Sequence, residues 1–328
     1  MKKNIAVIGC GHWGKNLVRN FAELAVLASV CDPNTELAQN LAEQYGVNNQ
    51  TFAEIIEDVT IEGIVLAVPA PLHAGLAIQA MNAGKHVYVE KPLAMNQTEA
   101  RQMIERSKEH GVHLMVGHLL QYHPIFKALR ELVATGALGG LSYVYSNRLS
   151  FGKVRSEEDV IWSFAPHDIS MILSLTAQEP ELVRTESSTI LQEKIADTAT
   201  VHMKFKSGLK AHIFVSWLHP YKEQKLVVIV ESAMAVFDDT QPWEKKLAIS
   251  QYKIDFHGDV PGPVKSDVEY IDVAQSEPLK NECQHFIDVV NGRSMPSTDG
   301  DEGLRVLNVL SAATLSQNEI DGVRISNL

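Results

Sequence analysis

The sequence predicts an α/β fold. An N-terminal, doubly wound parallel sheet with helices on both faces is followed by an α+β part with a mostly antiparallel sheet. In the first part, short apolar runs alternate with helical patterns, which is typical of parallel strands joined by covering helices. The remainder has many strand-like runs with few helices between them. Some of these runs alternate in polarity, as in an antiparallel sheet with one face in water.

The elements of the first part follow from its hydrophobic periodicity. Continuous apolar runs predict strands at 4–10, 25–32, 61–69, 85–92 and 112–118. Apolar residues at helical spacing predict helices at 13–24, 34–46, 72–84 and 96–111. Asn34 or Thr35 is the expected N-cap of the second helix, and Gly46 is its expected C-cap.

The second part is organised differently. Strand-like runs lie at 141–150, 198–208, 209–217, 225–239 and 246–256. Segment 157–176 is predicted to be largely helical with an interruption at Pro166, and 256–267 to be a Pro/Gly loop. Two helices, 277–292 and 300–322, close the chain. Its 328 residues suit two domains, which we place at 1–119 and 120–328, with the closing helices able to pack back on the first.

The composition excludes several classes of protein. A formal net charge of −11 repels nucleic acid and anionic membranes, so neither is an expected partner. Cys10, Cys31 and Cys283 lack paired spacing, which argues against a disulfide scaffold. The histidines lack ligand spacing, so no metal is expected. No apolar run reaches membrane-spanning length, and the cytoplasm is the expected compartment.

A glycine-rich loop joins the first strand to the first helix. In Gly9-x-Gly11-x-x-Gly14, the first glycine permits a tight turn, the second lets a pyrophosphate approach, and the third lets helix and strand pack closely. Asp32 ends the second strand, where an acid binds a ribose 2′-hydroxyl and repels a 2′-phosphate. The loop therefore predicts NAD rather than NADP. The alternative is a turn that binds nothing, with Asp32 as a helix cap.

Two further strand ends carry unusual residues at the edge where such sheets bind ligands. Pro69 and His73 follow the third strand, and Glu90, Lys91 and Pro92 end the fourth. The proline holds Lys91 extended, or in a cis bond, and its ammonium could stabilise negative charge developing on a substrate oxygen. Composition alone favours a solvated strand end, whereas the position after a dinucleotide loop favours a functional lysine.

His167, in "WSFAPHDI", is a second candidate for chemistry. A histidine can act as a general base near neutral pH, although a structural histidine is the commoner case. Its neighbour Asp168 points elsewhere on a helix and is a poor orienting partner.

Polar and basic residues occur together in 147–155, and a second stretch, 216–225, carries Trp217, His219 and Lys222. Asn147, Arg148, Lys153 and Arg155 could hold a diphosphate while an aromatic ring stacks a base. A solvated strand face is the alternative.

The motifs "GCGHWG…CD…HAGLAIQAMNAGKHVYVEKPLA" resemble the glucose–fructose oxidoreductase/inositol dehydrogenase/MocA family, over essentially the whole chain. The EKP segment is far more specific than the glycine loop. "GHLLQYHP" and "YVYSNRLSFGKVRSEEDVIWSFAPHDISMIL" look most like members that act on UDP-linked amino sugars. The resemblance implies an N-terminal NAD-binding Rossmann domain. It also implies a C-terminal α+β domain with a large, mostly antiparallel open sheet for substrate binding and oligomerisation.

The resemblance assigns the catalytic lysine to Lys91 and the catalytic histidine to His167, with Pro92 placing the lysine. Two positions depart from the family pattern. Ser163 stands where an aspartate is common, and Val68-Pro69-Ala70 replaces Thr-Pro-Asn. The expected cofactor-binding residues are Gly9, Gly11, His12, Trp13, Gly14, Asp32, Pro69, His73, Glu90 and Lys91. The expected substrate-binding residues are Gln121, Tyr122, Asn147, Arg148, Lys153, Arg155, Ser163 and Trp217.

The implied activity is NAD-dependent oxidation of the C3 hydroxyl of a UDP-N-acetylhexosamine, with His167 as base and Lys91 holding the oxygen, or with these roles exchanged. Alternatives are a UDP-N-acetylglucosaminuronate 3-dehydrogenase, an inositol or free-sugar dehydrogenase, and a non-enzymatic NAD-binding regulator. The resemblance also implies a homodimer or homotetramer formed through the C-terminal sheet.

Overall fold

The chain forms two compact units in the computed structural model, which describes residues 2–152, 154–257, 259–317, 319 and 321–328. The first unit contains residues 1–122 and 277–307, and the second contains 123–276 and 308–328. Residues 277–307 therefore belong with the N-terminal part although they follow the second unit in sequence. Each unit is built around its own sheet.

The sheet of the first unit has six parallel strands in the order β3-β2-β1-β4-β5-β6. Its strands are β1 (Ile5–Ile8), β2 (Leu27–Cys31), β3 (Asn48–Asn49), β4 (Gly63–Leu66), β5 (His86–Glu90) and β6 (Leu114–Gly117). Its helices are α1 (Gly14–Glu23), α2 (Thr35–Tyr45), α3 (Phe52–Glu57), α4 (His73–Asn82), α5 (Gln97–Glu109) and α8 (Pro278–Val290), with short 3-10 turns at Ala70–Leu72 and Leu119–Tyr122. The strand order reverses beside β1, which is the point where doubly wound sheets bind ligands.

The ends of α2 show how local sequence sets these boundaries. The Asn34 side chain accepts a hydrogen bond from the Leu37 N–H, at 3.1 Å, and Gly46 ends the helix at φ 61°. An Asx N-cap and a left-handed glycine are the preferred solutions for the unpaired backbone groups of a helix. The predicted caps of this helix are confirmed.

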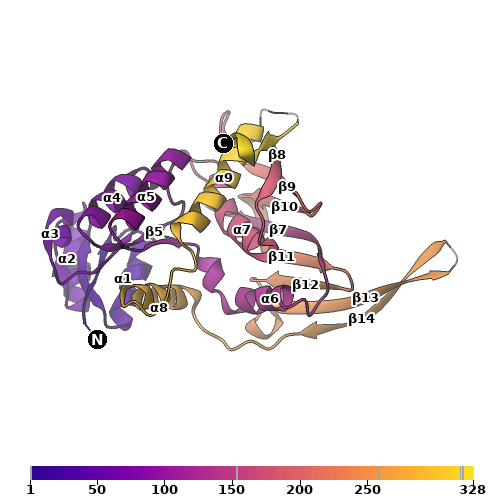
Figure 1. Cartoon of the computed structure of the whole chain (residues 1–328), viewed down its shortest axis with the longest axis horizontal. Helices are drawn as coiled ribbons and strands as arrows, with labels where there is room; N and C mark the ends of the chain where they lie inside the picture. The colour runs from indigo at the N-terminus through magenta and orange to yellow at the C-terminus, as the bar shows by residue number, and fades with distance from the viewer. Residues whose placement is uncertain (1, 153, 258, 318, 320) are drawn as a thin grey trace. The chain divides into compact units, whose positions relative to one another are not determined.

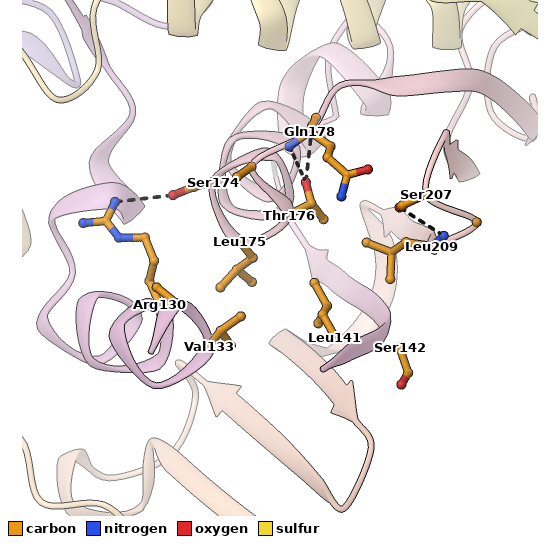
Figure 2. A pocket seen from close by; sticks show the side chains of 13 residues that line it. Arg130, Val133, Leu141, Ser142, Ser174, Leu175, Thr176, Gln178, Ser207 and Leu209 are labelled. Atoms are coloured by element: carbon orange, nitrogen blue, oxygen red, sulfur yellow. Dashed lines mark hydrogen bonds between the residues drawn. The ribbon is translucent and has the colours of Figure 1, made fainter. Parts of the chain in front are cut away.

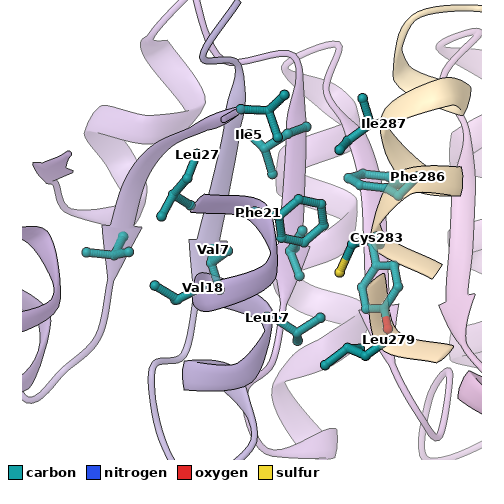
Figure 3. Close-up of a cluster of buried hydrophobic side chains, with 14 of the residues drawn as sticks. Ile5, Val7, Leu17, Val18, Phe21, Leu27, Leu279, Cys283, Phe286 and Ile287 are labelled. Carbon is teal, nitrogen blue, oxygen red and sulfur yellow. The ribbon is translucent and has the colours of Figure 1, made fainter. Parts of the chain in front are cut away.

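The core of the first unit joins the sheet to α1 and α8. Phe21 of α1 and Phe286 of α8 meet edge to face, 6.3 Å apart, and Tyr88 of β5 packs against the same Phe286 at 5.8 Å. Figure 3 shows α8 laying its apolar face, including Leu279 and Ile287, against these side chains. This shared core explains why α8 belongs to the first unit.

The second unit contains a nine-stranded sheet in the order β14-β13-β12-β11-β7-β10-β9-β8-β15. Its strands are β7 (Leu141–Phe151), β8 (Pro180–Ser188), β9 (Thr198–Phe205), β10 (Lys210–Ser216), β11 (Leu218–Val230), β12 (Ala233–Asp238), β13 (Leu247–His257), β14 (Val260–Tyr270) and β15 (Val323–Arg324). Among the described strand pairs, β7 and β10 run parallel and the others antiparallel. The predicted fold class is confirmed.

Helices α6 (Pro124–Ala134) and α7 (Val160–Thr176) belong to the second unit, and α9 (Gly300–Ser316) continues from the first unit into it. The predicted interruption of α7 at Pro166 is wrong, because the helix runs through this proline. Tertiary packing can compensate for the one backbone hydrogen bond that a proline removes.

The prediction of a Pro/Gly loop at 256–267 is also wrong. Most of this segment belongs to β13 and β14, which Figure 1 shows as a long hairpin. Pro261 and Pro263 lie in β14, opposite Phe256 and Ile254 of β13. Because β14 is an edge strand of the sheet, a proline there removes no hydrogen bond from the interior.

Two features are absent from the described part of the chain. No described helix is long and apolar enough to cross a membrane. No group of three or more His, Cys, Asp or Glu side chains in that part of the chain could hold a metal ion.

Candidate functional site

The glycine-rich loop of the first unit has the geometry that a dinucleotide pyrophosphate requires. Gly9 has a φ of +88°, and a Cβ on it would lie 2.5 Å from the Ala67 carbonyl oxygen. A Cβ on Gly14 would lie 1.9 Å from the Gly9 oxygen, so only glycine permits this close packing. At Gly11 a Cβ would meet no described atom within 4 Å. This glycine therefore leaves open space at the N-terminus of α1.

The N-terminus of α1 also suits an anion. Within the described residues, no side chain caps this helix and its first turn contains no acid. The unpaired N–H groups and the helix dipole both favour a negative group at such an end. The residues present therefore fit a nicotinamide dinucleotide, whose pyrophosphate the loop would hold.

Asp32 lies beside this loop at the end of β2. Its carboxylate accepts hydrogen bonds from the backbone N–H of Cys10, at 2.6 Å, and of Asn34, at 2.8 Å. These bonds fix a half-buried carboxylate next to the first glycine turn. A carboxylate held there can accept a ribose hydroxyl. His12 of the loop and Pro69 after β4 are both exposed.

Lys91 follows β5 directly, and the Lys91–Pro92 peptide bond is cis. The buried His73 contacts the backbone near this bond. Its Nδ1 lies 2.8 Å from the Pro92 carbonyl oxygen, and its Nε2 lies 3.0 Å from the Val68 carbonyl oxygen. Burial lowers the pKa of His73, although both carbonyls favour its protonated form. With 1% exposure, His73 fastens the end of β5 to the end of β4 rather than offering a ring to a cofactor.

Glu90 precedes Lys91 and accepts hydrogen bonds from three donors in the described part of the chain. The donors are the Trp13 indole N–H at 2.6 Å, the Tyr88 hydroxyl at 3.1 Å and the Lys91 backbone N–H at 3.3 Å. Burial raises the pKa of Glu90, while the Trp13 hydrogen bond and the charge of Lys91 act to lower it. Glu282 of α8 is fully buried beside Tyr88. We call Trp13, Tyr88, Glu90 and Glu282 the Glu90 cluster.

Gly117, at the end of β6, makes room for the Glu90 cluster. A Cβ at this position would lie 2.7 Å from the Tyr88 hydroxyl oxygen and 3.0 Å from Glu90 Oε1. Any larger residue would therefore displace these two side chains.

In the second unit, α7 carries His167, which is half-buried, and the buried Asp168. Arg148 of β7 binds this carboxylate at two points, with Nε 2.5 Å from one oxygen and Nη2 3.3 Å from the other. The Ser146 hydroxyl donates to it as well. Arg148 therefore fixes the segment of α7 that carries His167 to the central strand of the sheet.

Asn147 lies between Ser146 and Arg148 on β7, and its side-chain amide donates a hydrogen bond to the Glu223 carboxylate, at 2.7 Å. Side chains alternate between the two faces of a strand. Asn147 therefore points to the face opposite Ser146 and Arg148, away from α7.

Several predicted substrate-binding residues are placed away from solvent. Trp217 is fully buried and its indole N–H donates to Asp197, at 2.6 Å, so its ring is part of the core and is not available to stack a base. Tyr122 is 1% exposed, with its hydroxyl 3.1 Å from that of Thr298. Gln121 and Ser163 are also buried.

Arg155 and Lys153 are the remaining predicted cations of the substrate site. Arg155 is exposed, with its guanidinium 3.6 Å from the Glu158 carboxylate. Lys153 lies outside the described residues.

A pocket of about 620 Å³ lies within the second unit, where the C-terminal ends of α6 and α7 meet β7 and the β9–β10 turn (Figure 2). The Arg130 guanidinium on its wall donates to Ser174, at 3.3 Å. None of the predicted site residues is among the described residues that line this pocket, so it is separate from the site considered above.

Comparison with known proteins identifies the family. A family model described as "Oxidoreductase family, NAD-binding Rossmann fold" matches residues 3–118, and a GFO/IDH/MocA C-terminal domain model matches residues 126–236. The chain belongs to the GFO/IDH/MocA oxidoreductase family. Its first unit contains the NAD-binding Rossmann fold and the protein is an oxidoreductase, so a purely regulatory role is not supported.

Individual relatives cover almost the whole chain. A UDP-N-acetylglucosamine 3-dehydrogenase of Acidithiobacillus ferrooxidans is 28% identical over 310 residues, which are 92% of this chain and 93% of the relative. A solved structure of that organism's UDP-N-acetylglucosamine 3-dehydrogenase GnnA has a TM-score of 0.85 at 26% identity and covers 95% of this chain and 96% of the other. A myo-inositol 2-dehydrogenase of Thermotoga maritima is 25% identical over an alignment of 339 positions, which covers 99% of each chain.

Sequence patterns did not predict a role for Glu282 or Gly117, and they indicated only a poor orienting partner in Asp168. Glu282 does leave a signal, because it occupies a core position in the helical stripe formed by Leu279, Cys283 and Phe286. A charged residue at such a position needs a specific environment. Gly117 and the partner of Asp168 depend on distant contacts that no local pattern encodes.

Proposed function

We propose that the protein oxidises the C3 hydroxyl of a UDP-N-acetylhexosamine to a 3-keto sugar, with NAD as the cofactor. The similarity to the UDP-N-acetylglucosamine 3-dehydrogenase of A. ferrooxidans carries this proposal, because it extends over nearly the full length of both chains in sequence and in fold.

Asp32 supports NAD over NADP. Its carboxylate, fixed by the N–H groups of Cys10 and Asn34, would accept the adenosine ribose 2′-hydroxyl and repel a 2′-phosphate. Neither Pro33 nor Asn34 is an arginine that could hold such a phosphate. Replacement of Asp32 with Ala should lower the ratio of NAD affinity to NADP affinity by roughly 10- to 150-fold, since a charge-assisted hydrogen bond contributes about 1.5–3 kcal/mol.

We assign the chemistry to Lys91 and His167. The bound nicotinamide supplies the hydride acceptor. The Lys91 ammonium would hold the C3 oxygen and stabilise its negative charge, and the His167 imidazole would take the hydroxyl proton. Ser163, which replaces a common aspartate of the family, has no charge to stabilise the imidazolium, so the exchanged assignment of base and electrophile remains the alternative.

A polyol such as an inositol is the second candidate substrate. Arg148 would have supported a diphosphate, but Asp168 already neutralises its guanidinium. The myo-inositol dehydrogenase of T. maritima also aligns with 99% of the chain. A UDP-N-acetylglucosaminuronate stays a further alternative within the nucleotide sugars.

We also propose that the protein is a homodimer or homotetramer assembled through the open sheet of the second unit. The face opposite α7 carries Tyr145, Phe214 and Val236, which are only half-buried. The three cysteines are free thiols, which is compatible with the cytoplasm as the proposed compartment.

The deciding experiment follows reduction of NAD by the absorbance of the reduced cofactor at about 340 nm. The substrates compared are UDP-N-acetylglucosamine, UDP-N-acetylgalactosamine, UDP-N-acetylglucosaminuronate and myo-inositol. We expect turnover with a UDP-N-acetylhexosamine and a 3-keto product by mass spectrometry after borodeuteride trapping. Turnover with myo-inositol alone would replace the first proposal with the second.

A further inference from the structure

The Glu90 carboxylate is held by groups from separate parts of the first unit. The Trp13 indole belongs to the glycine-rich loop, whereas the Tyr88 hydroxyl comes from β5 itself. All three of its described donors are uncharged groups, so they orient the carboxylate without cancelling its charge. That charge remains available to the neighbouring Lys91.

Glu282 is a second carboxyl group in the same place. It has no exposed surface, and neither oxygen has a hydrogen-bond partner among the described residues. The Tyr88 hydroxyl lies beside it but donates to Glu90. Two carboxylates in one poorly solvated site cannot both be ionised at modest cost. Burial, followed by the charge of Glu90, raises the pKa of Glu282 well above its ordinary value.

The other titratable groups around the cluster do not change this balance. Cys283 of α8 stays a neutral thiol, because its burial, the largest cause, raises its pKa well above the ordinary value. Glu302 of α9 raises the pKa of Glu282 further, and its own carboxylate is paired with His118 at 2.5 Å. Lys91 is the cation whose charge acts on Glu90.

We propose that Trp13, Tyr88 and Glu282 are positioning residues that keep one negative charge, on Glu90, beside the Lys91 ammonium. This inference rests on the proposed function, in which Lys91 acts as the electrophile. Glu282 contributes by staying protonated, and Tyr88 and Trp13 contribute by stabilising the ionised form of Glu90. Because Trp13 belongs to the glycine-rich loop, the loop that holds the pyrophosphate also sets the charge next to the reacting lysine.

The experiment measures the charge state of Lys91 directly, without turnover. The lysine amines of the full-length protein are reductively methylated with a ¹³C label. Their ¹³C-methyl NMR signals are then followed as the pH is raised, with and without NAD. The Lys91 signal is assigned as the one that is lost in Lys91→Arg. In Glu90→Gln we expect the Lys91 midpoint to fall by about 1 pH unit, the effect of removing a nearby opposite charge. Trp13→Phe, which keeps the ring but lacks the N–H, should give a smaller fall.

Glu282→Gln is the matched comparison, because glutamine reproduces a neutral acid. We expect the Lys91 midpoint to stay within experimental error of the wild type. A fall as large as that of Glu90→Gln would overturn the proposal, because the charge would then reside on Glu282. No fall in Glu90→Gln or in Trp13→Phe would also overturn it. Thermal melting of each variant excludes loss of folding as the cause.

The two proposals fail in different ways. If Lys91 titrates as expected but Lys91→Arg and Lys91→Met retain turnover, the proposed catalytic role is wrong and the charge arrangement stands. If those variants are inactive but Lys91 titrates identically in all cluster variants, the positioning proposal alone is wrong.

Discussion

Each unit contains a carboxylate directly beside a candidate catalytic residue, and the two carboxylates are bound by donors of different charge. Glu90 precedes Lys91 and is bound by uncharged donors, Trp13 and Tyr88. Asp168 follows His167 and is bound at two points by the Arg148 guanidinium. The first arrangement preserves a charge that can act on its neighbour. The second cancels a charge and leaves an anchor between helix and sheet. A carboxylate beside a catalytic residue therefore has no fixed role, since its donors decide what it does.

The largest expected effect concerns Lys91, whose neighbour Glu90 keeps its charge. Lys91→Met should abolish turnover, because the variant has no ammonium to stabilise charge on the substrate oxygen. NAD binding, measured by quenching of tryptophan fluorescence, should change less than about threefold, since the proposed pyrophosphate site is the glycine-rich loop, which does not include Lys91. Near wild-type turnover would show that the end of β5 is a structural strand end.

The next largest effect concerns Arg148, which neutralises the charge of Asp168. Arg148→Met should lower the free energy of unfolding by about 3 kcal/mol, because Asp168, which is 1% exposed, would keep an unpaired buried charge. Urea denaturation gives this value. Arg148→Met combined with Asp168→Leu should recover much of the loss. A loss in the double variant as large as in the single one would contradict the anchor role.

A third prediction concerns the pH dependence of stability that Glu282 confers. Its pKa is raised in the folded state, so the folded protein binds more protons than the unfolded chain above the ordinary carboxyl pKa of 4.5. Wild-type stability should therefore fall relative to Glu282→Gln as the pH rises from 4.5, by at most about 1.4 kcal/mol per pH unit. Urea midpoints at several pH values check this sign. Parallel curves would show that Glu282 is not desolvated.

The smallest effects come from a pair of glycine variants. Gly117→Ala should lower the free energy of unfolding by about 1–2 kcal/mol, because its Cβ would lie 2.7 Å from the Tyr88 hydroxyl. Gly75→Ala is the control, since a Cβ there meets no described atom within 4 Å on helix α4, and it should raise stability by roughly 0.5–1 kcal/mol. Thermal melting compares them. Equal effects would mean that Gly117 does not confine the Glu90 cluster.

The sequence predicted features that depend on neighbouring residues. The caps of α2 at Asn34 and Gly46 follow from local hydrogen bonding and backbone freedom, and both are confirmed. The fold class follows from the periodicity of apolar residues, which fixes strand and helix types along the chain. Errors arose where tertiary context overrides a local preference. Pro166 lies inside α7, and Pro261 and Pro263 lie on an edge strand where their missing N–H is tolerated.

By itself, the sequence determined the two sheet types, the glycine-rich loop with Asp32, and the placement of Lys91 at a strand end, because periodicity and short motifs are local properties. Only the tertiary structure decided that Glu282 lies beside Tyr88, that Arg148 is bound to Asp168, and that Trp217 is buried. These facts depend on which donors and which solvent each side chain meets. Such contacts join residues up to 194 positions apart, as between Tyr88 and Glu282, so no local pattern encodes them.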